Sequence, residues 1–295
     1  MRSIIRNQGR SLLFIAPSAI VFSIFMFWPL IRTVYFSFFD WNFISPEMEF
    51  VGIKNYITLF KDPITKKVFI NTGFYIIVLL ILNFILPYII SYVLSAIVKR
   101  GHNFYKSALF LPSVISLVVG SILYMWILNP VSGPIGLIAK RFGFNIPIWS
   151  KTDGLVIVVI SIITSWKVFG YNFLVLFASV SGVPKEVIEA AKIDNLSNFK
   201  IFKDIIFPMT SATGVYVFII TIVQGLQQGF IPIKVITQGG PYYASSSLTY
   251  HSYHHAFTMF SVGTASALSV ITMLLFGVLL FLEFQFVEKK VYYEN

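Results

Sequence analysis

Two long apolar runs are separated by the charged stretch Val183-Pro184-Lys185-Glu186-Val187-Ile188-Glu189-Ala190-Ala191-Lys192-Ile193-Asp194-Asn195. This stretch carries too many charges to cross a bilayer. Pro184 suits the first turn of a helix, where its missing N–H costs nothing, and Asn195 tolerates the left-handed backbone that ends one. Between them, apolar residues recur every three or four positions, as on one face of a helix. The pattern predicts an amphipathic helix outside the hydrocarbon core, held by another component or resting on lipid.

The chain as a whole has the composition of an integral membrane protein. Its 295 residues are 57% hydrophobic and 12% charged, with a mean hydropathy of +0.81, whereas soluble domains carry about 25% charged residues. The absence of cysteine excludes disulfides, thiolate metal sites and cysteine nucleophiles. The net charge of +10 does not indicate nucleic-acid binding, because the basic residues are distributed as in the loops of a membrane protein.

Six apolar runs are long enough to cross hydrocarbon, which takes about 20 helical residues. We therefore expect a single all-α membrane domain with six transmembrane helices, in which the charged stretch lies between the fourth and the fifth. The second run contains Asn83 and Pro87, which predict a tilt or a kink. The predicted spans are residues 12–36, 68–98, 107–128, 155–180, 212–235 and 262–286, with a connecting loop at 181–208.

The placement of lysine and arginine predicts the orientation, since these residues favour the cytoplasmic side of a membrane. With the N-terminus inside, the inner loops hold more of them than the outer loops. The inner set is Arg2, Arg6, Arg10, Lys99, Arg100, Lys106, Lys185, Lys192, Lys200, Lys203, Lys289 and Lys290, and the outer set is Lys54, Lys61, Lys66, Lys67, Lys140, Arg141 and Lys151. Both termini and the 181–208 loop are therefore expected in the cytoplasm.

Several motifs resemble those of one family and follow its order along the chain. Val183-Pro184-x-Glu186, Glu189-Ala190-Ala191 and Ile193-Asp194, with Phe202, Ile205 and Pro208 after them, are similar to the "EAA" coupling motif of bacterial ABC importer permeases. The family's usual glycine after the aspartate is Asn195 here, and its second proline after Pro208 is absent.

Four further elements resemble those of carbohydrate permeases: Phe50-Val51-Gly52-Ile53-Lys54-Asn55-Tyr56, Asn71-Thr72, Leu111-Pro112 and Thr237-Gln238-Gly239-Gly240-Pro241. Over nearly its whole length the chain thus resembles the first of the two permeases in the maltose/glycerol-phosphate group.

The resemblance implies a complex in the bacterial inner membrane with a second permease, two ATPase subunits and an extracytoplasmic solute-binding protein. This chain would be a transport subunit and no enzyme, with no cofactor or metal of its own. ATP and magnesium would bind to the partner ATPase, because this chain has no Gly-rich phosphate-binding loop followed by lysine. The residues implied in ATPase coupling are Pro184, Glu186, Glu189, Ala190, Ala191, Asp194 and Asn195.

Polar residues inside the fourth and fifth spans are candidates for a substrate path. Lys167 lies near the middle of the fourth span, where a lysine costs about 2.5–3.5 kcal/mol on insertion scales. In maltose-type permeases the sugar-contacting residues lie on these two helices, and the resemblance carries this role to Thr164, Lys167, Val168, Tyr171, Thr221, Gln224, Gln227 and Gln228. The competing interpretation is that these groups form hydrogen bonds between helices.

We therefore expect the substrate to be a sugar or oligosaccharide. Because Lys167 has no acidic residue in its own span, our hypothesis is an acidic saccharide, such as a uronate oligosaccharide or a sugar phosphate. An acidic partner on the second permease is the alternative. An ion-coupled secondary transporter is the rival function, but it needs a carboxylate within a span, and the nearest is Glu283 at the inner edge of the last one.

Overall fold

The computed structural model describes residues 14–98 and 100–286, which are mostly helical. Within this part of the chain, five helices are long and apolar enough to cross a membrane, and one bent pair of helices makes a sixth candidate. The predicted all-helical membrane fold is thereby confirmed. The start of the first predicted span, and the terminal basic residues used to predict orientation, lie outside the described residues. The five helices are Phe14–Phe36, Pro63–Ile97, Leu155–Ser181, Ser211–Thr237 and Val262–Leu282.

The chain divides into two compact units, and the first comprises the residues up to Asp62 together with Ser252–Met273. A two-stranded antiparallel hairpin, which the sequence did not predict, pairs Phe39 with Phe50. The described elements that begin in this unit are η1 (Ser23–Phe27), α2 (Trp28–Phe36), β1 (Phe39–Asp40), β2 (Glu49–Phe50), α3 (Lys54–Lys61) and α15 (Val262–Phe286).

Asn55, from the first carbohydrate-permease motif, holds the hairpin region together. Its Nδ2 donates to the carbonyls of Ser37 and Phe39, both at 2.9 Å. A Cβ on Gly263 would lie 1.8 Å from the Phe39 carbonyl oxygen, so only glycine fits at that position. The motif therefore has a structural role, because it closes the turn between α2 and α3.

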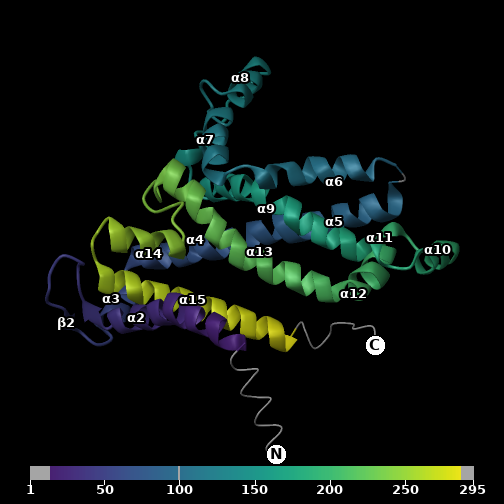
Figure 1. Ribbon diagram of the computed structural model, residues 1–295. Coiled ribbons are helices and arrows are strands. Elements are labelled where there is room, and N and C mark those ends of the chain that lie inside the picture. Colours follow the sequence, from purple (N-terminus) through teal and green to yellow (C-terminus); the bar gives the residue numbers. More distant parts are fainter. Residues whose placement is uncertain (1–13, 99, 287–295) are drawn as a thin grey trace, which may run out of the picture. The chain divides into compact units, whose positions relative to one another are not determined.

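The second unit comprises Pro63–His251 together with the residues from Leu274 onward. Within it α5, α6, α9 and α13 run side by side, with α10 and the α5–α6 turn at one end and α8 away from that end (Figure 1). Its elements are α4 (Pro63–Leu80), η2 (Ile81–Ile85), α5 (Leu86–Tyr92), η3 (Val93–Ile97), α6 (His102–Phe110), η4 (Leu111–Val114), α7 (Leu117–Ile127), α8 (Pro134–Arg141), η5 (Trp149–Lys151), α9 (Leu155–Ser181), α10 (Lys185–Ile193), α11 (Asn198–Ile201), η6 (Phe202–Ile206), α12 (Phe207–Met209), α13 (Ser211–Pro232), η7 (Ile233–Thr237) and α14 (Leu248–Phe257), the last crossing the boundary between the units.

The predicted third span, residues 107–128, differs from the expected single helix. The helical segments His102–Val114 and Leu117–Ile127 meet at an angle of 100°. Pro112 lies in the short 3-10 helix η4, and Ile115 and Ser116 after it adopt extended backbone, which ends the helical hydrogen bonding. The two segments together are apolar enough for a span, as predicted, but hydropathy cannot show where a helix is interrupted.

The broken span packs very closely on α9 at Gly170. A Cβ at this position would lie 2.6 Å from the carbonyl oxygen of Leu109 and 2.8 Å from the Cα of Phe110. These are backbone atoms, which cannot move aside without shifting the whole of α6. Small residues allow this kind of approach between membrane helices, where van der Waals packing drives association.

Gly170→Ala is expected to lower the stability of the detergent-solubilised protein by about 1–3 kcal/mol, because overpacking forces α6 away from α9. Gly73→Ala is the matched control, since nothing lies within 4 Å of a Cβ at that helical position. Thermal unfolding followed by circular dichroism should show a lower melting temperature for the first variant only. Equal melting temperatures would contradict the packing described for α6.

Candidate functional site

A buried polar cluster joins the second, fourth and fifth spans and consists of Asn83, Ser165, Asn172 and Thr221. Pro87 has no N–H to offer the carbonyl of Asn83 four residues before it, and an unpaired carbonyl in hydrocarbon is costly. Asn172 Nδ2 donates to that carbonyl at 2.7 Å and to Thr221 Oγ1 at 2.9 Å. Asn83 Nδ2 donates to Ser165 Oγ at 2.8 Å. The cluster therefore repairs the interruption that Pro87 makes in the second span.

Some predicted substrate contacts lie in this interior and not on an exposed face. Thr221 is fully buried in the polar cluster, and Thr164 is buried with its hydroxyl donating to the Ile160 carbonyl at 2.8 Å. Val168 is buried as well. Thr221 thus forms the hydrogen bonds between helices that the competing interpretation describes, whereas Thr164 bonds within its own helix. Asn172 was missed in the sequence, although an asparagine in an apolar run is the kind of signal that identifies such a group.

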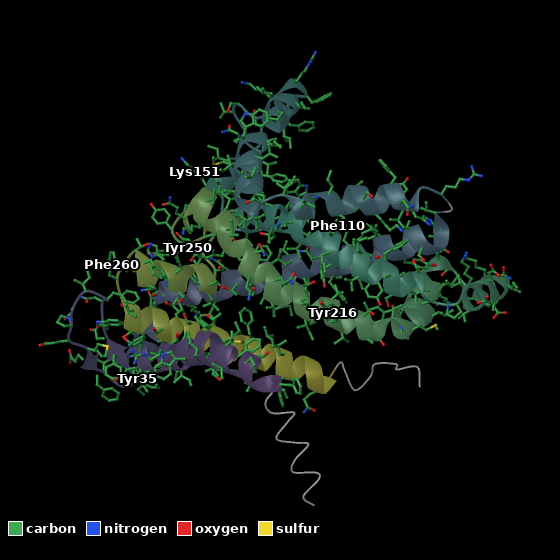
Figure 2. All side chains as sticks on the ribbon, in the orientation of Figure 1. Tyr35, Phe110, Lys151, Tyr216, Tyr250 and Phe260 are labelled. Carbon is green, nitrogen blue, oxygen red and sulfur yellow. The ribbon has the colours of Figure 1, made fainter. Side chains whose placement is uncertain are left out.

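Another group of the predicted residues does lie on an exposed face formed by α9 and α13. Tyr171 is 41% exposed and Tyr216, on α13, is 43% exposed, and their hydroxyls are 3.0 Å apart. Figure 2 labels Tyr216 in the part of α13 nearer α12. Gln227 is exposed, while Gln224 and Gln228 are half-buried. Tyr216 had not been singled out, because a tyrosine toward one end of a span is also typical of interfacial anchoring.

Lys167 forms hydrogen bonds with backbone carbonyls at the break in the third span. Its Nζ donates to the carbonyls of Ser113 and Ile115, each at 2.9 Å, and Ser113 Oγ donates to the Lys167 carbonyl, also at 2.9 Å. Both acceptors lie at the bend between η4 and α7, where helical donors are missing. Among the described residues no carboxylate pairs with Lys167. Its ammonium group thus donates two hydrogen bonds to backbone carbonyls, and no carboxylate of the described residues neutralises its charge.

The 181–208 segment contains α10, α11, η6 and α12 and is fixed to the bundle by one face. Ile188 and Ala191 on α10 are buried in the same apolar core as Val180 and Ile206. The bend after α10 lies at Asn195, whose φ is +57°, as the sequence predicted. Pro184 directly precedes α10 in place of occupying its first turn. The remaining predicted coupling residues are exposed, namely Pro184, Glu186, Glu189, Ala190, Asp194 and Asn195.

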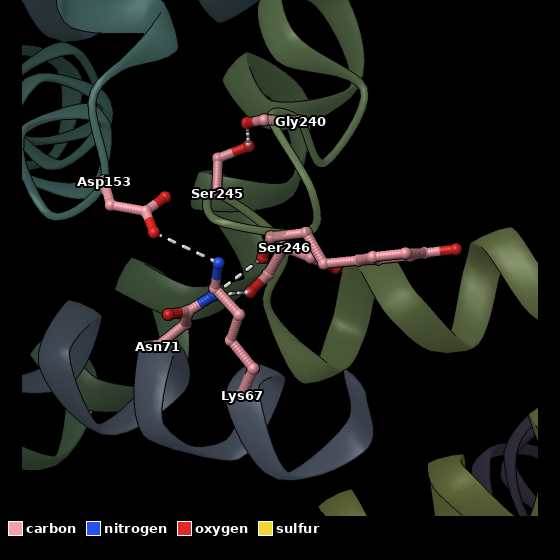
Figure 3. A network of polar contacts seen from close by, with 7 residues as sticks. Lys67, Asn71, Asp153, Gly240, Ser245 and Ser246 are labelled. Atoms are coloured by element: carbon pink, nitrogen blue, oxygen red, sulfur yellow. Dashed lines mark hydrogen bonds and ion pairs between the residues drawn. The ribbon is translucent and has the colours of Figure 1, made fainter. Parts of the chain in front are cut away.

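Two motifs that are far apart in the sequence meet at the other end of this unit. Asn71 Nδ2 donates to the carbonyls of Tyr243 at 2.8 Å and Ser246 at 3.2 Å, and Ser245 Oγ donates to the Gly240 carbonyl at 2.6 Å (Figure 3). The Thr72 hydroxyl accepts from the Leu248 N–H at 3.0 Å. The Asn71-Thr72 pair therefore holds in place the loop that contains Gly239-Gly240-Pro241 and continues to Leu248, which we call the Gly-Gly-Pro loop. The exposed ion pair beside it, between Lys67 and Asp153, adds little to stability.

The family described as the binding-protein-dependent transport system inner membrane component matches residues 91–292. The chain belongs to this family. The match extends from α5 into the C-terminal region and so includes the exposed face of α9 and α13 and the whole 181–208 segment. The chain is accordingly a transport subunit, a permease, and a multi-pass membrane protein, as predicted. Membership favours this function over the ion-coupled secondary transporter.

Curated relatives resemble the permease over nearly its full length. The sn-glycerol-3-phosphate transport system permease protein UgpA of Escherichia coli is 28% identical over 295 residues, covering 99% of both chains. The probable ABC transporter permease protein YurN of Bacillus subtilis is 29% identical over 274 residues, covering 91% of this chain and 93% of YurN. These relatives agree with the carbohydrate-type resemblance of the sequence motifs.

A solved structure has the same fold. It is described as a bacterial ABC transporter involved in the import of the acidic polysaccharide alginate, and the matching chain is 19% identical with a TM-score of 0.82. The match covers 97% of the permease and 99% of that chain. At this identity the likeness concerns the fold alone.

Lys167→Met is expected to destabilise the solubilised permease by about 1–3 kcal/mol, because it leaves the two carbonyls at the bend without their donor. Lys66→Met is the control, since Lys66 is exposed. Chemical or thermal unfolding should separate the two variants. If both unfold like the parent protein, the hydrogen bonds of Lys167 to the bend do not contribute to the fold.

Proposed function

We propose that this permease is one membrane subunit of an ATP-driven importer that moves an acidic saccharide from a soluble binding protein into the cytoplasm. The observation that carries the substrate proposal is the ammonium group of Lys167, which has no carboxylate partner within the described residues and lies beside the exposed face of α9. The compounds named in the descriptions of two similar transport systems, sn-glycerol-3-phosphate and alginate, are both anionic.

The electrostatics of Lys167 support an anionic substrate. Carbonyl oxygens accept hydrogen bonds from an ammonium group but do not cancel its charge, and a third N–H remains available. Away from bulk water such a charge interacts strongly with its surroundings, because the effective dielectric constant is low. A carboxylate or phosphate passing the exposed face would therefore be attracted to this point. An acidic residue of the second permease is the alternative partner.

The neighbouring residues supply groups that suit a sugar. Tyr171 and Tyr216 present aromatic rings with hydroxyls at an exposed surface, and such rings combine an apolar face with a polar tip. Gln224, Gln227 and Gln228 would form hydrogen bonds with sugar hydroxyls. We assign no direct contact with substrate to Thr164, Val168 and Thr221, which support this face from behind.

The 181–208 segment is proposed to bind the ATPase. One face of α10 is buried against the bundle, so the helix can move only with it, while Glu186 and Glu189 stay exposed. Ile193 is 80% exposed and Phe199 is 72% exposed at the same end. Large exposed apolar groups among charges are typical of a protein-binding surface. Glu189 would engage a basic group of the ATPase, which itself binds ATP and magnesium.

The complete complex would contain a second permease, two ATPase subunits and the solute-binding protein. The α5–α6 turn and α10 lie at the same end of their unit (Figure 1). This agrees with the prediction that both lie on the cytoplasmic side of the membrane. We propose that this end is cytoplasmic, that both chain termini are on the same side, and that the binding protein docks on the opposite side.

Glu189→Lys should reduce recovery of the ATPase at least about tenfold when the tagged permease is purified gently from its native membrane, because it places a like charge against the basic partner. Asp204→Ala is the control, as it removes an exposed acid from the same segment outside the predicted coupling set. Quantitative mass spectrometry measures the ATPase and the second permease. Equal recovery with both variants would argue against this docking surface.

Lys167→Gln should lower the uptake of an alginate pentasaccharide at least about tenfold relative to Lys167→Arg, because glutamine keeps hydrogen-bond donors but not the charge. Uptake is measured in vesicles that contain the complete complex, and a neutral maltopentaose and sn-glycerol-3-phosphate are tested alongside. Equal import of the neutral sugar by the parent and the glutamine variant, with no import of either anion, would refute the acidic-substrate hypothesis.

A further inference from the structure

Tyr88 on α5 connects the second span with the 181–208 segment. It is buried, and its ring lies 5.6 Å from the ring of Phe202 on η6 and 5.5 Å from that of Phe207 on α12, measured between centroids. A Cβ on Gly214 would lie 3.3 Å from the same ring, so α13 also approaches closely. One side chain of the second span thus contacts both η6 and α12 of the segment that we propose binds the ATPase.

The hydroxyl of Tyr88 adds a hydrogen bond to these ring contacts. It forms a hydrogen bond with the hydroxyl of Thr210, the residue that links α12 to α13. The Tyr88 hydroxyl also donates to the Thr210 carbonyl at 3.4 Å, and Thr210 Oγ1 donates to the Ile206 carbonyl at 2.6 Å. A buried hydrogen bond of this kind fixes the distance between the two elements more tightly than ring packing alone.

Tyr88 is also connected in the other direction, toward the middle of the membrane. Its ring packs edge-on against Phe84 at 5.7 Å, and Phe84 packs against Phe218 of α13 at 5.5 Å. Phe84 directly follows Asn83, whose carbonyl is held by Asn172 and Thr221 in the polar cluster. Contacts therefore run without a gap from the 181–208 segment through Tyr88 to the polar cluster behind the exposed face.

The second span can follow a movement of the 181–208 segment only through non-covalent contacts, because the chain does not join the two directly. The fourth and fifth spans are continuous with the 181–208 segment, so any displacement of that segment reaches them through the backbone. The second span has no such connection. We propose that Tyr88 is the positioning residue that moves the second span together with the 181–208 segment, through its hydrogen bond to Thr210. This inference rests on the proposed function of that segment.

The matched control is provided by Tyr92, one turn further along α5. Its ring packs against the same Phe202 at 5.4 Å, and it is buried, but its hydroxyl has no hydrogen-bond partner among the described residues. Tyr88→Phe and Tyr92→Phe thus remove the same atom from the same aromatic cluster. Only the first removes a hydrogen bond between the second span and Thr210.

The test uses distances between pairs of spin labels in the assembled complex, which this chain suits because it has no cysteine. Cysteines of the partner subunits are replaced beforehand. One label is placed at Lys151, and the second at Ile89 of the second span or at Ala178 of the fourth, all of which are exposed. Electron paramagnetic resonance distances are compared between the nucleotide-free and the ATP–vanadate-trapped complex.

Lys151 and Ala178 lie near the two ends of α9, so the 151–178 distance should stay the same on trapping and serves as the internal control. In the parent protein the 151–89 distance should also stay the same, because Tyr88 makes the second span move with the segment to which α9 is joined. In Tyr88→Phe, the ratio of complexes with a changed 151–89 distance to those with an unchanged one should rise about fivefold relative to Tyr92→Phe, as expected for one lost hydrogen bond. Thr210→Val should reproduce this result and add little to it in the double variant.

An equal response of the 151–89 pair in Tyr88→Phe and Tyr92→Phe would overturn the inference, as would a 151–89 distance that changes on trapping in the parent protein. Failure of the unmodified permease to assemble with an ATPase would count against the proposed function instead, so assembly is measured first.

Discussion

Every backbone carbonyl inside hydrocarbon needs a donor, and at two interruptions of the described spans that donor is a side chain of α9. Pro87 withholds a donor from Asn83 in the second span, and extended backbone at Ile115 and Ser116 interrupts the third. Both deficits are met by α9, through Asn172 in the first case and Lys167 in the second. Since unpaired backbone is tolerated in membranes only where protein or water satisfies it, the arrangement of the bundle depends on this one helix.

The same helix also carries part of the exposed face proposed to meet the substrate. Ser165 and Asn172 on its buried side form hydrogen bonds with neighbouring helices, whereas Tyr171 on another side is exposed. Lys167 lies between the two environments, because its carbonyl partners belong to the bend of the third span and its charge is the group proposed to attract an anionic substrate. A rigid helix that is fixed by its neighbours is a suitable support for binding groups, since their positions then vary little.

The amphipathic character of the 181–208 segment, its bend at Asn195 and the all-helical membrane fold could be predicted from the sequence, because they depend on local periodicity and composition. The bend in the third span and the partners of Lys167 could not, since they depend on which helices lie next to each other. The sequence motifs do not show which of them are in contact. Asn71 and the Gly-Gly-Pro loop belong to separate motifs, and only the structure shows that the asparagine carboxamide donates hydrogen bonds to that loop. Tyr216 was missed because its significance comes from its contact with Tyr171.

The hydrogen bonds of Lys167 Nζ to the bend limit which substitutions among related sequences could reveal this contact. Both of its acceptors are main-chain oxygens, which every amino acid possesses. Replacements at position 115 leave the Nζ contact in place, and replacements at position 113 remove only the bond from Ser113 Oγ to the Lys167 carbonyl. Selection to keep the Nζ contact therefore falls on Lys167. Correlated substitution, which identifies many contacts between side chains, would not detect this one even in a large set of related sequences.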